Sequence, residues 1–131
     1  TATYPGTSRP PSGCFMRRSP AAYLSDILEA CDAVEEVPRG VSLADYLESR
    51  SVRSAVEREF IIIGEAVNML RRVAPHIGDE ITEARLIVGF RNVLTHDYSA
   101  IDDETVYSVA LTDLPQLRKE SADLLESLGA G

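Results

Sequence analysis

The stretch GFRNVLTHDYSAID (residues 89–102) brings together the side chains that could do chemistry: Arg91, Asn92, His96, Asp97 and Tyr98. Histidine titrates near neutral pH, so it can both take and give a proton. Arginine stays charged and presents a planar fork of donors to phosphate oxygens. A His and an Arg therefore suffice in principle for metal-free RNA cleavage. The His would move the proton of the 2′-hydroxyl or of the leaving group, while the Arg stabilises charge on the phosphorus oxygens.

Helix geometry limits which of these side chains can meet. Five residues of an ideal helix turn through about 500°, so Arg91 and His96 lie roughly 140° apart. They do not share a face unless the helix ends or distorts between them. Asn92 and His96 are four residues apart and do share a face, so Asn92 can orient the imidazole. We therefore expect the cluster to work at a helix C-terminus, or where two copies of the chain meet.

The R-x-x-x-x-H spacing alone carries little information, because the chain contains it twice. The second copy, RRVAPH, places His76 five residues after Arg71 with Pro75 between them. Proline breaks or kinks a helix when it lies in the interior, so we expect the helix to end before Pro75. His76 is then expected in a loop beyond an ordinary surface helix end. The context of each motif must decide between them.

The elements that carry these residues are predicted to be helical throughout. Apolar side chains recur at the i, i+3, i+4, i+7 spacing of one helix face, and no alternating strand pattern appears. The expected helices span 19–36, a short segment after residue 42, 52–73, a segment from about 82 into 95–102, and a segment from about 103 onward. Short breaks at 37–42 and 74–80 separate them. This order predicts an all-α, antiparallel bundle of four to five helices.

Local signals indicate where these helices begin. Ser19 is an expected N-cap with Pro20 in the first helical position, where a missing N–H costs nothing. Ser42 is expected to cap the short helix, and Thr82 the helix that carries Arg91.

Three further expectations concern the packing of the helices. Gly64 interrupts a long helix and predicts the close approach of a neighbouring helix. Pro115 predicts a kink or break in the last helical segment. The inward positions of the helix that carries Arg91 are expected to be Leu86, Ile87, Phe90, Val93 and Leu94.

Length and composition are those of one soluble globular domain: 131 residues, 44% hydrophobic and 26% charged. Residues 1–18 are rich in Pro, Ser, Thr and Gly, and we expect a disordered tail or a vector-derived segment, with Met16 as the natural start. Residues 19–131 form the expected helical domain. No apolar run is long enough to span a membrane. The two cysteines, Cys14 and Cys31, suit a reducing cytoplasm.

The net charge of −8 argues against binding nucleic acid through overall phosphate attraction. Any RNA chemistry must then depend on a local cluster or on a partner's surface. Three glutamates of one helix, Glu57, Glu59 and Glu65, lack paired histidines and are expected on a solvated face rather than in a metal site. Three aspartates are expected to supply turn and helix-cap chemistry: Asp97, Asp102 and Asp103.

The sequence RNVLTHDY combines Arg-Asn, a His five residues after the Arg, and a Tyr two residues beyond the His. It resembles the R-N-x-x-x-H-x-Y signature of the HepT group of HEPN-domain proteins, the toxin halves of two-gene toxin–antitoxin systems. The resemblance covers about 110 residues, through MRRSPAAYLSDILEA, REFIIIGEAVNML and DLPQLRKE in the same order. No motif position departs from the pattern.

The resemblance implies an all-helical homodimer whose two motifs face a shared cleft. It implies metal-independent endoribonuclease activity without a cofactor, with Arg91 and His96 as the catalytic pair and Asn92 supporting them. It also implies a type VII-like system in which a nucleotidyltransferase antitoxin, of the MntA kind, neutralises the toxin by transferring AMP to Tyr98.

Three alternatives remain beside these implications. His96 can act as a helix-capping cation, and Tyr98 can simply pack its ring and bond its hydroxyl. The whole chain can be a non-catalytic HEPN-like module that binds a nucleotide or a partner protein. The acidic charge favours the binding module, and the complete Arg-Asn-His-Tyr set favours the nuclease.

Overall fold

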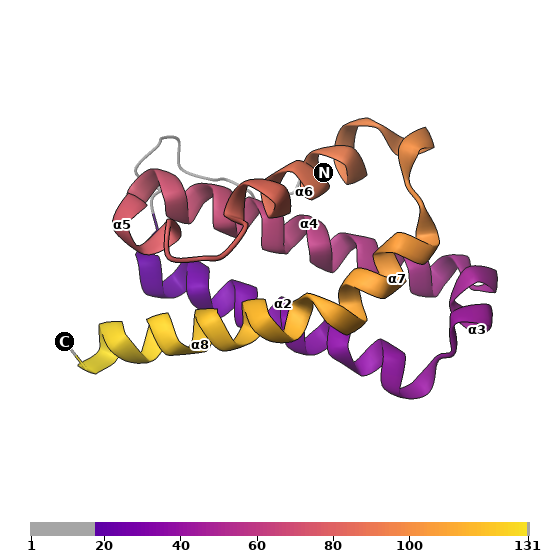
Figure 1. The fold of residues 1–131 in the computed structure, drawn as a ribbon, viewed down its shortest axis with the longest axis horizontal. Helices are drawn as coiled ribbons and strands as arrows, with labels where there is room; N and C mark the ends of the chain where they lie inside the picture. Colours follow the sequence, from indigo (N-terminus) through magenta and orange to yellow (C-terminus); the bar gives the residue numbers. More distant parts are fainter. Residues whose placement is uncertain (1–17, 131) are drawn as a thin grey trace, which may run out of the picture.

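The computed structural model describes residues 18–130, apart from the side chains at positions 38, 39, 98 and 130. Every regular element within this range is a helix (Figure 1), as the periodicity predicted. The elements in chain order are α2 (Pro20–Gly40), α3 (Leu43–Glu48), α4 (Arg50–Val73), α5 (Pro75–Gly78), α6 (Ala84–His96), the 3-10 turn η2 (Tyr98–Ala100), α7 (Asp103–Thr112) and α8 (Leu114–Ala130). The tail expected over residues 1–18 lies outside the described residues, except for Arg18.

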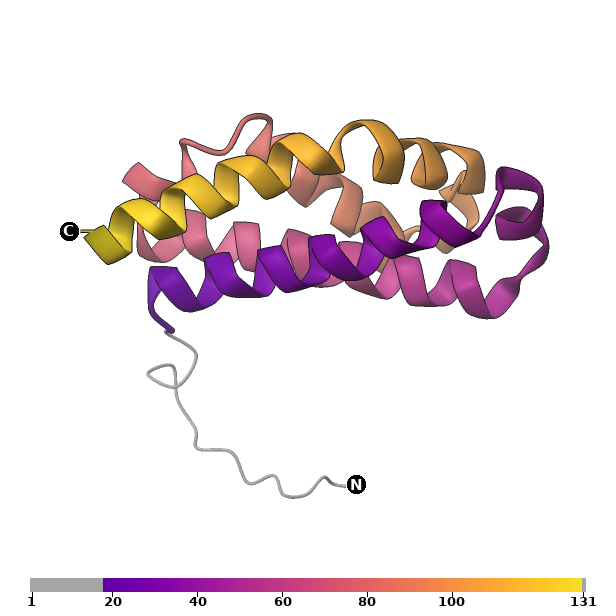
Figure 2. The same cartoon turned by 90° about the horizontal axis from the view of Figure 1, so that it is seen from below.

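The long helices run up and down beside one another as a bundle, with α7 and α8 together forming its last member (Figures 1 and 2). Helix α2 packs against both α4 and α8, whereas α6 packs mainly against α4. The helix that carries Arg91 and His96 is therefore peripheral, and one side of it has little of the same chain to cover it.

The core is apolar and is formed mainly by α2 and α4. The apolar stripe of α4 is buried at Val56, Phe60, Ile63, Val67 and Leu70. From α2, Leu24 and Ile27 are fully buried against it. Each such side chain contributes about 1.5–3 kcal/mol of transfer free energy. This burial makes α4 a rigid support for the helix packed on it.

Several predicted helix boundaries are confirmed. Ser19 Oγ accepts a hydrogen bond from the Ala22 amide at 3.1 Å, and Ser42 Oγ accepts from Asp45 at 3.2 Å. The predicted break near Pro115 falls between α7 and α8, which begins at Leu114. Proline is tolerated there because the first turn of a helix has no intrahelical acceptor for its missing N–H.

Two expected breaks in the chain are wrong. Helix α2 continues through Gly40 instead of ending before residue 37, because Val37 still packs against the core and its carbonyl accepts from the Val41 amide at 2.8 Å. Residues 75–78 form the short helix α5 instead of a loop. Pro75 occupies the first helical position, where it fits, and the following turn buries Ile77.

Two expectations about α6 are also wrong. Thr82 does not cap it: α6 begins after Glu83, whose φ of 58° is left-handed, and Thr82 instead donates through N and Oγ1 to the Glu120 carboxylate at 2.9 and 2.6 Å. Leu86 does not point inward, since it is 66% exposed. The reason is that α6 packs mainly on α4, so the residues that face away from α4 find no partner in the same chain.

Candidate active site

Arg91 lies where α6 crosses α4, directly over Gly64. A Cβ atom added to Gly64 would lie 2.2 Å from the Arg91 Cβ and 2.7 Å from its Cγ. Real Cβ atoms do not approach that closely, so only glycine permits this crossing. The expectation that Gly64 marks a close helix approach is confirmed, and the residue that approaches it is the candidate catalytic arginine.

Two acceptors hold the Arg91 guanidinium. One terminal nitrogen donates to the Glu65 carboxylate at 2.8 Å, and the other donates to Asn92 Oδ1 at 2.6 Å. The Arg91 side chain is only 19% exposed, and its Nε is buried with no hydrogen-bond partner among the described residues. The terminal nitrogens therefore carry all the polar contacts that orient the group.

Glu65 lies on a solvated face, as expected, and its side chain is 52% exposed. Sequence reasoning missed that its carboxylate pairs with Arg91. The signal available in the sequence was its position next to Gly64. A glycine at which two helices touch brings the neighbouring residue beside the partner helix as well.

His96 is the last residue of α6 and is exposed. The helix continues without interruption from Arg91 to His96, so the estimate of roughly 140° between them stands for one chain. The structure does not bring these two side chains to one face. Asn92, expected to orient the imidazole, uses its amide oxygen on Arg91 instead.

The residues after His96 form a short connection to α7. Tyr98 begins η2, directly beyond the end of α6, and its side chain lies outside the described residues. Asp97 is the C-terminal boundary residue of α6. Asp102 caps α7, since its carboxylate accepts from the Glu104 amide at 3.1 Å. The expected cap chemistry of Asp102 is thus confirmed.

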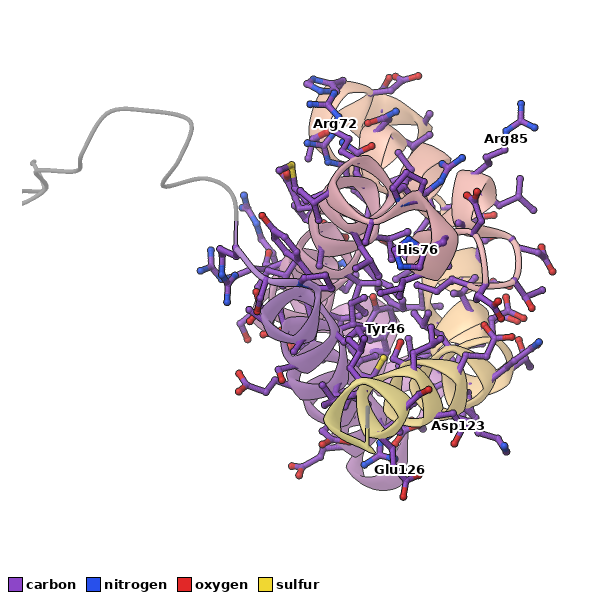
Figure 3. The ribbon with its side chains drawn as sticks, turned by 90° about the vertical axis from the view of Figure 1, so that its left-hand side faces the viewer. Tyr46, Arg72, His76, Arg85, Asp123 and Glu126 are labelled. Carbon is purple, nitrogen blue, oxygen red and sulfur yellow. The ribbon has the colours of Figure 1, made fainter. Side chains whose placement is uncertain are left out.

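The second R-x-x-x-x-H copy lies at an end of the bundle. Arg71 is in the last turn of α4, and the exposed His76 is in the separate helix α5 (Figure 3). The expectation that His76 lies in a loop is wrong, but the expectation that it lies beyond a surface helix end is confirmed.

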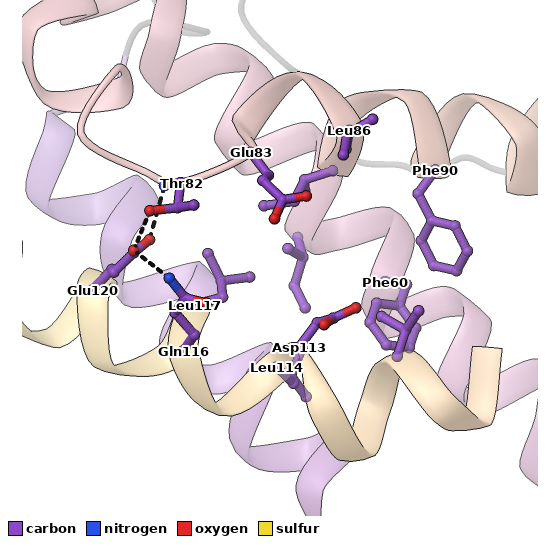
Figure 4. A pocket seen from close by; sticks show the side chains of 13 residues that line it. Phe60, Thr82, Glu83, Leu86, Phe90, Asp113, Leu114, Gln116, Leu117 and Glu120 are labelled. Carbon is purple, nitrogen blue, oxygen red and sulfur yellow. Dashed lines mark hydrogen bonds between the residues drawn. The ribbon is translucent and has the colours of Figure 1, made fainter. Parts of the chain in front are cut away.

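A groove of about 230 Å³ opens between α6 and the last helices of the chain, with Phe60 and Ile63 of α4 among its lining residues (Figure 4). Its walls come from α6 on one side and from α7 and α8 on the other, and the Phe60 and Phe90 rings meet edge to face at 5.4 Å. Three carboxylates stand among its lining residues: Glu83, Asp113 and Glu120. The groove is thus apolar with an acidic border, and Arg91 is not among its lining residues.

Other reactive groups offer no rival site in the part of the chain that is described. Burial raises the pKa of the Cys31 thiol to about 12, so it is not a thiolate at neutral pH. No group of three or more His, Cys, Asp or Glu side chains between residues 18 and 130 is arranged to hold a metal ion. Within the same range, no helix is long and apolar enough to cross a membrane.

Comparison with known proteins assigns the family. Residues 27–124 match the family model described as Ribonuclease HepT-like. The chain is 33% identical over 107 residues to a protein of Thermococcus cleftensis named "Probable ribonuclease HepT", covering 79% of this chain and 93% of that protein. It is 32% identical over 110 residues to a Methanocaldococcus jannaschii protein named "Putative RNase", covering 81% and 96% of the two chains.

No solved structure is significantly similar to this chain. The family match spans most of the sequence and contains the whole of α4 and α6, which carry Gly64, Glu65, Arg91 and His96. The chain therefore belongs to the HepT-like ribonuclease family.

Proposed function

We propose that this chain is a metal-independent endoribonuclease that acts as the toxin of a type VII-like toxin–antitoxin system. The observation that carries the proposal is how the side chains of the R-N-x-x-x-H motif are placed, within the segment that matches the family. Arg91 is held by Glu65 and Asn92 at a helix crossing, and His96 is exposed at the end of the same helix. A charged donor fork and an imidazole are two groups that suffice in principle for RNA transesterification.

In the proposed reaction, His96 moves a proton and Arg91 stabilises charge. The imidazole takes the proton of the attacking 2′-hydroxyl or supplies one to the departing 5′-oxygen. The Arg91 guanidinium donates to the non-bridging oxygens, on which negative charge grows as the phosphorus becomes pentacoordinate. Asn92 supports Arg91 through the bond to its terminal nitrogen.

A homodimer would supply what one chain lacks. Because Arg91 and His96 diverge around α6, we propose that a second copy brings its own motif into the same cleft. The uncovered side of α6 supports this surface: Leu86 is 66% exposed, and Gly89 has open space where a Cβ would be. Arg85 projects outward from α6 (Figure 3) and could pair with the acidic border of the groove on the other copy.

Cleavage assays with purified protein test the catalytic assignment. Wild type should cleave RNA with EDTA present, whereas Arg91→Ala and His96→Ala should lose most of the rate, because each removes a group that acts in the transition state. Equal cleavage by all three proteins would overturn the assignment and indicate a contaminating nuclease. Cleavage by wild type that disappears with EDTA would overturn metal independence.

A mixed dimer tests whether the two residues act across chains. Arg91→Ala and His96→Ala protomers are refolded together in equal amounts, so that half of the dimers contain one of each. If Arg91 of one chain works with His96 of the other, each mixed dimer has one intact site, and about a quarter of the wild-type rate returns. If the mixture is as inactive as the separate variants, the pair does not act across the interface.

The proposed antitoxin is a nucleotidyltransferase of the MntA kind that transfers AMP to Tyr98. An added phosphodiester two residues beyond His96 would place negative charge where an RNA phosphate must approach. Intact-mass measurement after co-expression with such an enzyme should show added AMP units on wild type. The same additions on Tyr98→Phe would show that another residue is modified.

A second candidate function is a non-catalytic module that binds a nucleotide or a partner protein. The net charge of −8 favours it, because the overall field repels RNA. Failure of the wild-type protein to cleave any RNA in a varied set, together with retained nucleotide or partner binding, would favour this function over the nuclease.

A further inference from the structure

Two consecutive residues of α4 hold the two ends of the Arg91 side chain. Gly64 contacts the base of the side chain, where a Cβ would collide with the Arg91 Cβ and Cγ. Glu65 accepts a hydrogen bond from the tip of the same side chain at 2.8 Å. A single segment of α4 therefore sets both how close Arg91 comes and which way its guanidinium points.

The two acceptors of the guanidinium are not equivalent. Asn92 is the next residue after Arg91 on α6, so it moves with the arginine and cannot anchor it to the bundle. Glu65 belongs to another helix, whose neighbouring residues Ile63 and Ala66 are buried in the core. It is thus the contact that ties the donor fork to the rigid part of the molecule.

Counting the donors shows what remains for a substrate. A guanidinium has five N–H donors. The Nε–H of Arg91 is buried without a partner, and one N–H of each terminal nitrogen is used by Glu65 or Asn92. One N–H on each terminal nitrogen is left, so two donors remain for a phosphate.

We infer that Glu65 is the positioning residue of the site: it fixes the Arg91 guanidinium so that the two remaining donors face the scissile phosphate. This inference rests on the proposed nuclease function. Glu65 does not bind RNA itself, since a carboxylate repels phosphate, and its effect on the reaction passes through Arg91. The Glu65 carboxylate of this pair is 52% exposed, and ion pairs open to solvent contribute little to stability, so the role that we assign to the pair is orientation.

The test compares wild type with Glu65→Ala, Glu65→Gln and Glu65→Asp. Asp32→Ala is the matched control, because it breaks another inter-helix arginine–carboxylate pair, with Arg118 at 2.6 Å, away from the motif. Steady-state cleavage over a range of RNA concentrations gives kcat and KM separately. For Glu65→Ala we expect kcat to fall by roughly ten- to a hundredfold, the size expected when a catalytic group loses its orientation. KM should change little, Glu65→Gln should recover part of the rate through its amide oxygen, and Asp32→Ala should match wild type.

The second readout is the Nε–Hε signal of Arg91 in ¹⁵N NMR, assigned by its loss in Arg91→Lys. Restricted rotation of the guanidinium is expected in wild type and in Asp32→Ala, and fast rotation in Glu65→Ala. This measurement does not need catalysis, so it tests the positioning role even if wild type cleaves no RNA.

Two results would overturn the inference. One is an Arg91 signal that is the same in Glu65→Ala and wild type, whatever the rates. The other is an active wild type whose kcat survives Glu65→Ala while Arg91→Ala is inactive, which would leave the proposed function intact and remove only the role of Glu65. Circular dichroism of each variant shows that a lost rate does not arise from unfolding.

Discussion

The two R-x-x-x-x-H stretches of this chain share a spacing and differ in the structure around it. Arg91 and His96 lie on one uninterrupted helix, α6. Arg71 lies at the end of α4 and His76 in α5, with a helix boundary between them. The same five-residue interval therefore lies within one helix in the first case and spans two separate helices in the second.

Both arginines also lie against a glycine, so close packing does not distinguish them. A Cβ on Gly78 would meet the Cα and Cγ of Arg71 at 2.7 Å, much as one on Gly64 would meet Arg91. What differs is how the charged end is held. Arg91 has two acceptors, at 2.6 and 2.8 Å, whereas the ion pair of Arg71 with Asp79 spans 3.9 Å. A fixed guanidinium, not a fixed spacing, separates the candidate site from its copy.

The largest expected effect is on the RNA cleavage rate, when alanine substitutions in the first motif are compared with those in the second. Arg91→Ala or His96→Ala should lower RNA cleavage by roughly a hundred- to ten-thousandfold, the range for losing a general acid–base or a charge-stabilising donor. Arg71→Ala and His76→Ala should stay within about twofold of wild type. Rates measured on the same RNA decide this. Comparable losses from both motifs would erase the distinction drawn between them.

The two glycines give the next largest effect. Gly64→Ala and Gly78→Ala should each lower the free energy of unfolding by about 1–3 kcal/mol, because each added Cβ overlaps an arginine on a neighbouring segment. Urea unfolding measures this. Gly40→Ala, where a Cβ meets nothing within 4 Å, is the control and should be neutral or slightly stabilising. Only Gly64→Ala should also lower cleavage per folded molecule; an equal loss in Gly78→Ala would contradict the comparison.

The surface beside the first motif gives a smaller effect. Leu86→Asp should weaken self-association by about tenfold or more if α6 forms the interface, because it places a charge in a buried apolar contact. Leu111→Asp alters a leucine of α7 that is 49% exposed and should leave association unchanged. Analytical ultracentrifugation over a concentration series compares them. A monomeric wild type, or equal weakening by both variants, would argue against a dimer through α6.

The smallest effect is expected from Asp79→Ala. It removes the 3.9 Å ion pair of Arg71, whose partner carboxylate is 68% exposed, and should change the free energy of unfolding by less than about 0.5 kcal/mol. Cleavage should be unaffected. A loss of rate similar to that predicted for Glu65→Ala would mean that ion pairing at either arginine perturbs the whole molecule.

Most of the fold could be predicted from local patterns. The stripe through Val56 and Leu70, the caps at Ser19 and Ser42, and the break near Pro115 depend on neighbours in the sequence, and each is found in the structure. The failures are at positions where tertiary packing decides. Leu86 has the periodicity of a core residue, yet it is exposed. Helix α6 packs mainly on α4, so the Leu86 side chain has little of the same chain to pack against.

The candidate site divides in the same way. The sequence by itself determined the order of Arg91, Asn92 and His96 and the helix that carries them, because a motif and a helix are local properties. It also determined the family to which the chain belongs. Only the tertiary structure decided that Glu65 holds Arg91 and that Gly64 permits the crossing. These contacts join residues 26 and 27 positions apart on two helices, and local periodicity contains no information on which faces of two helices will meet.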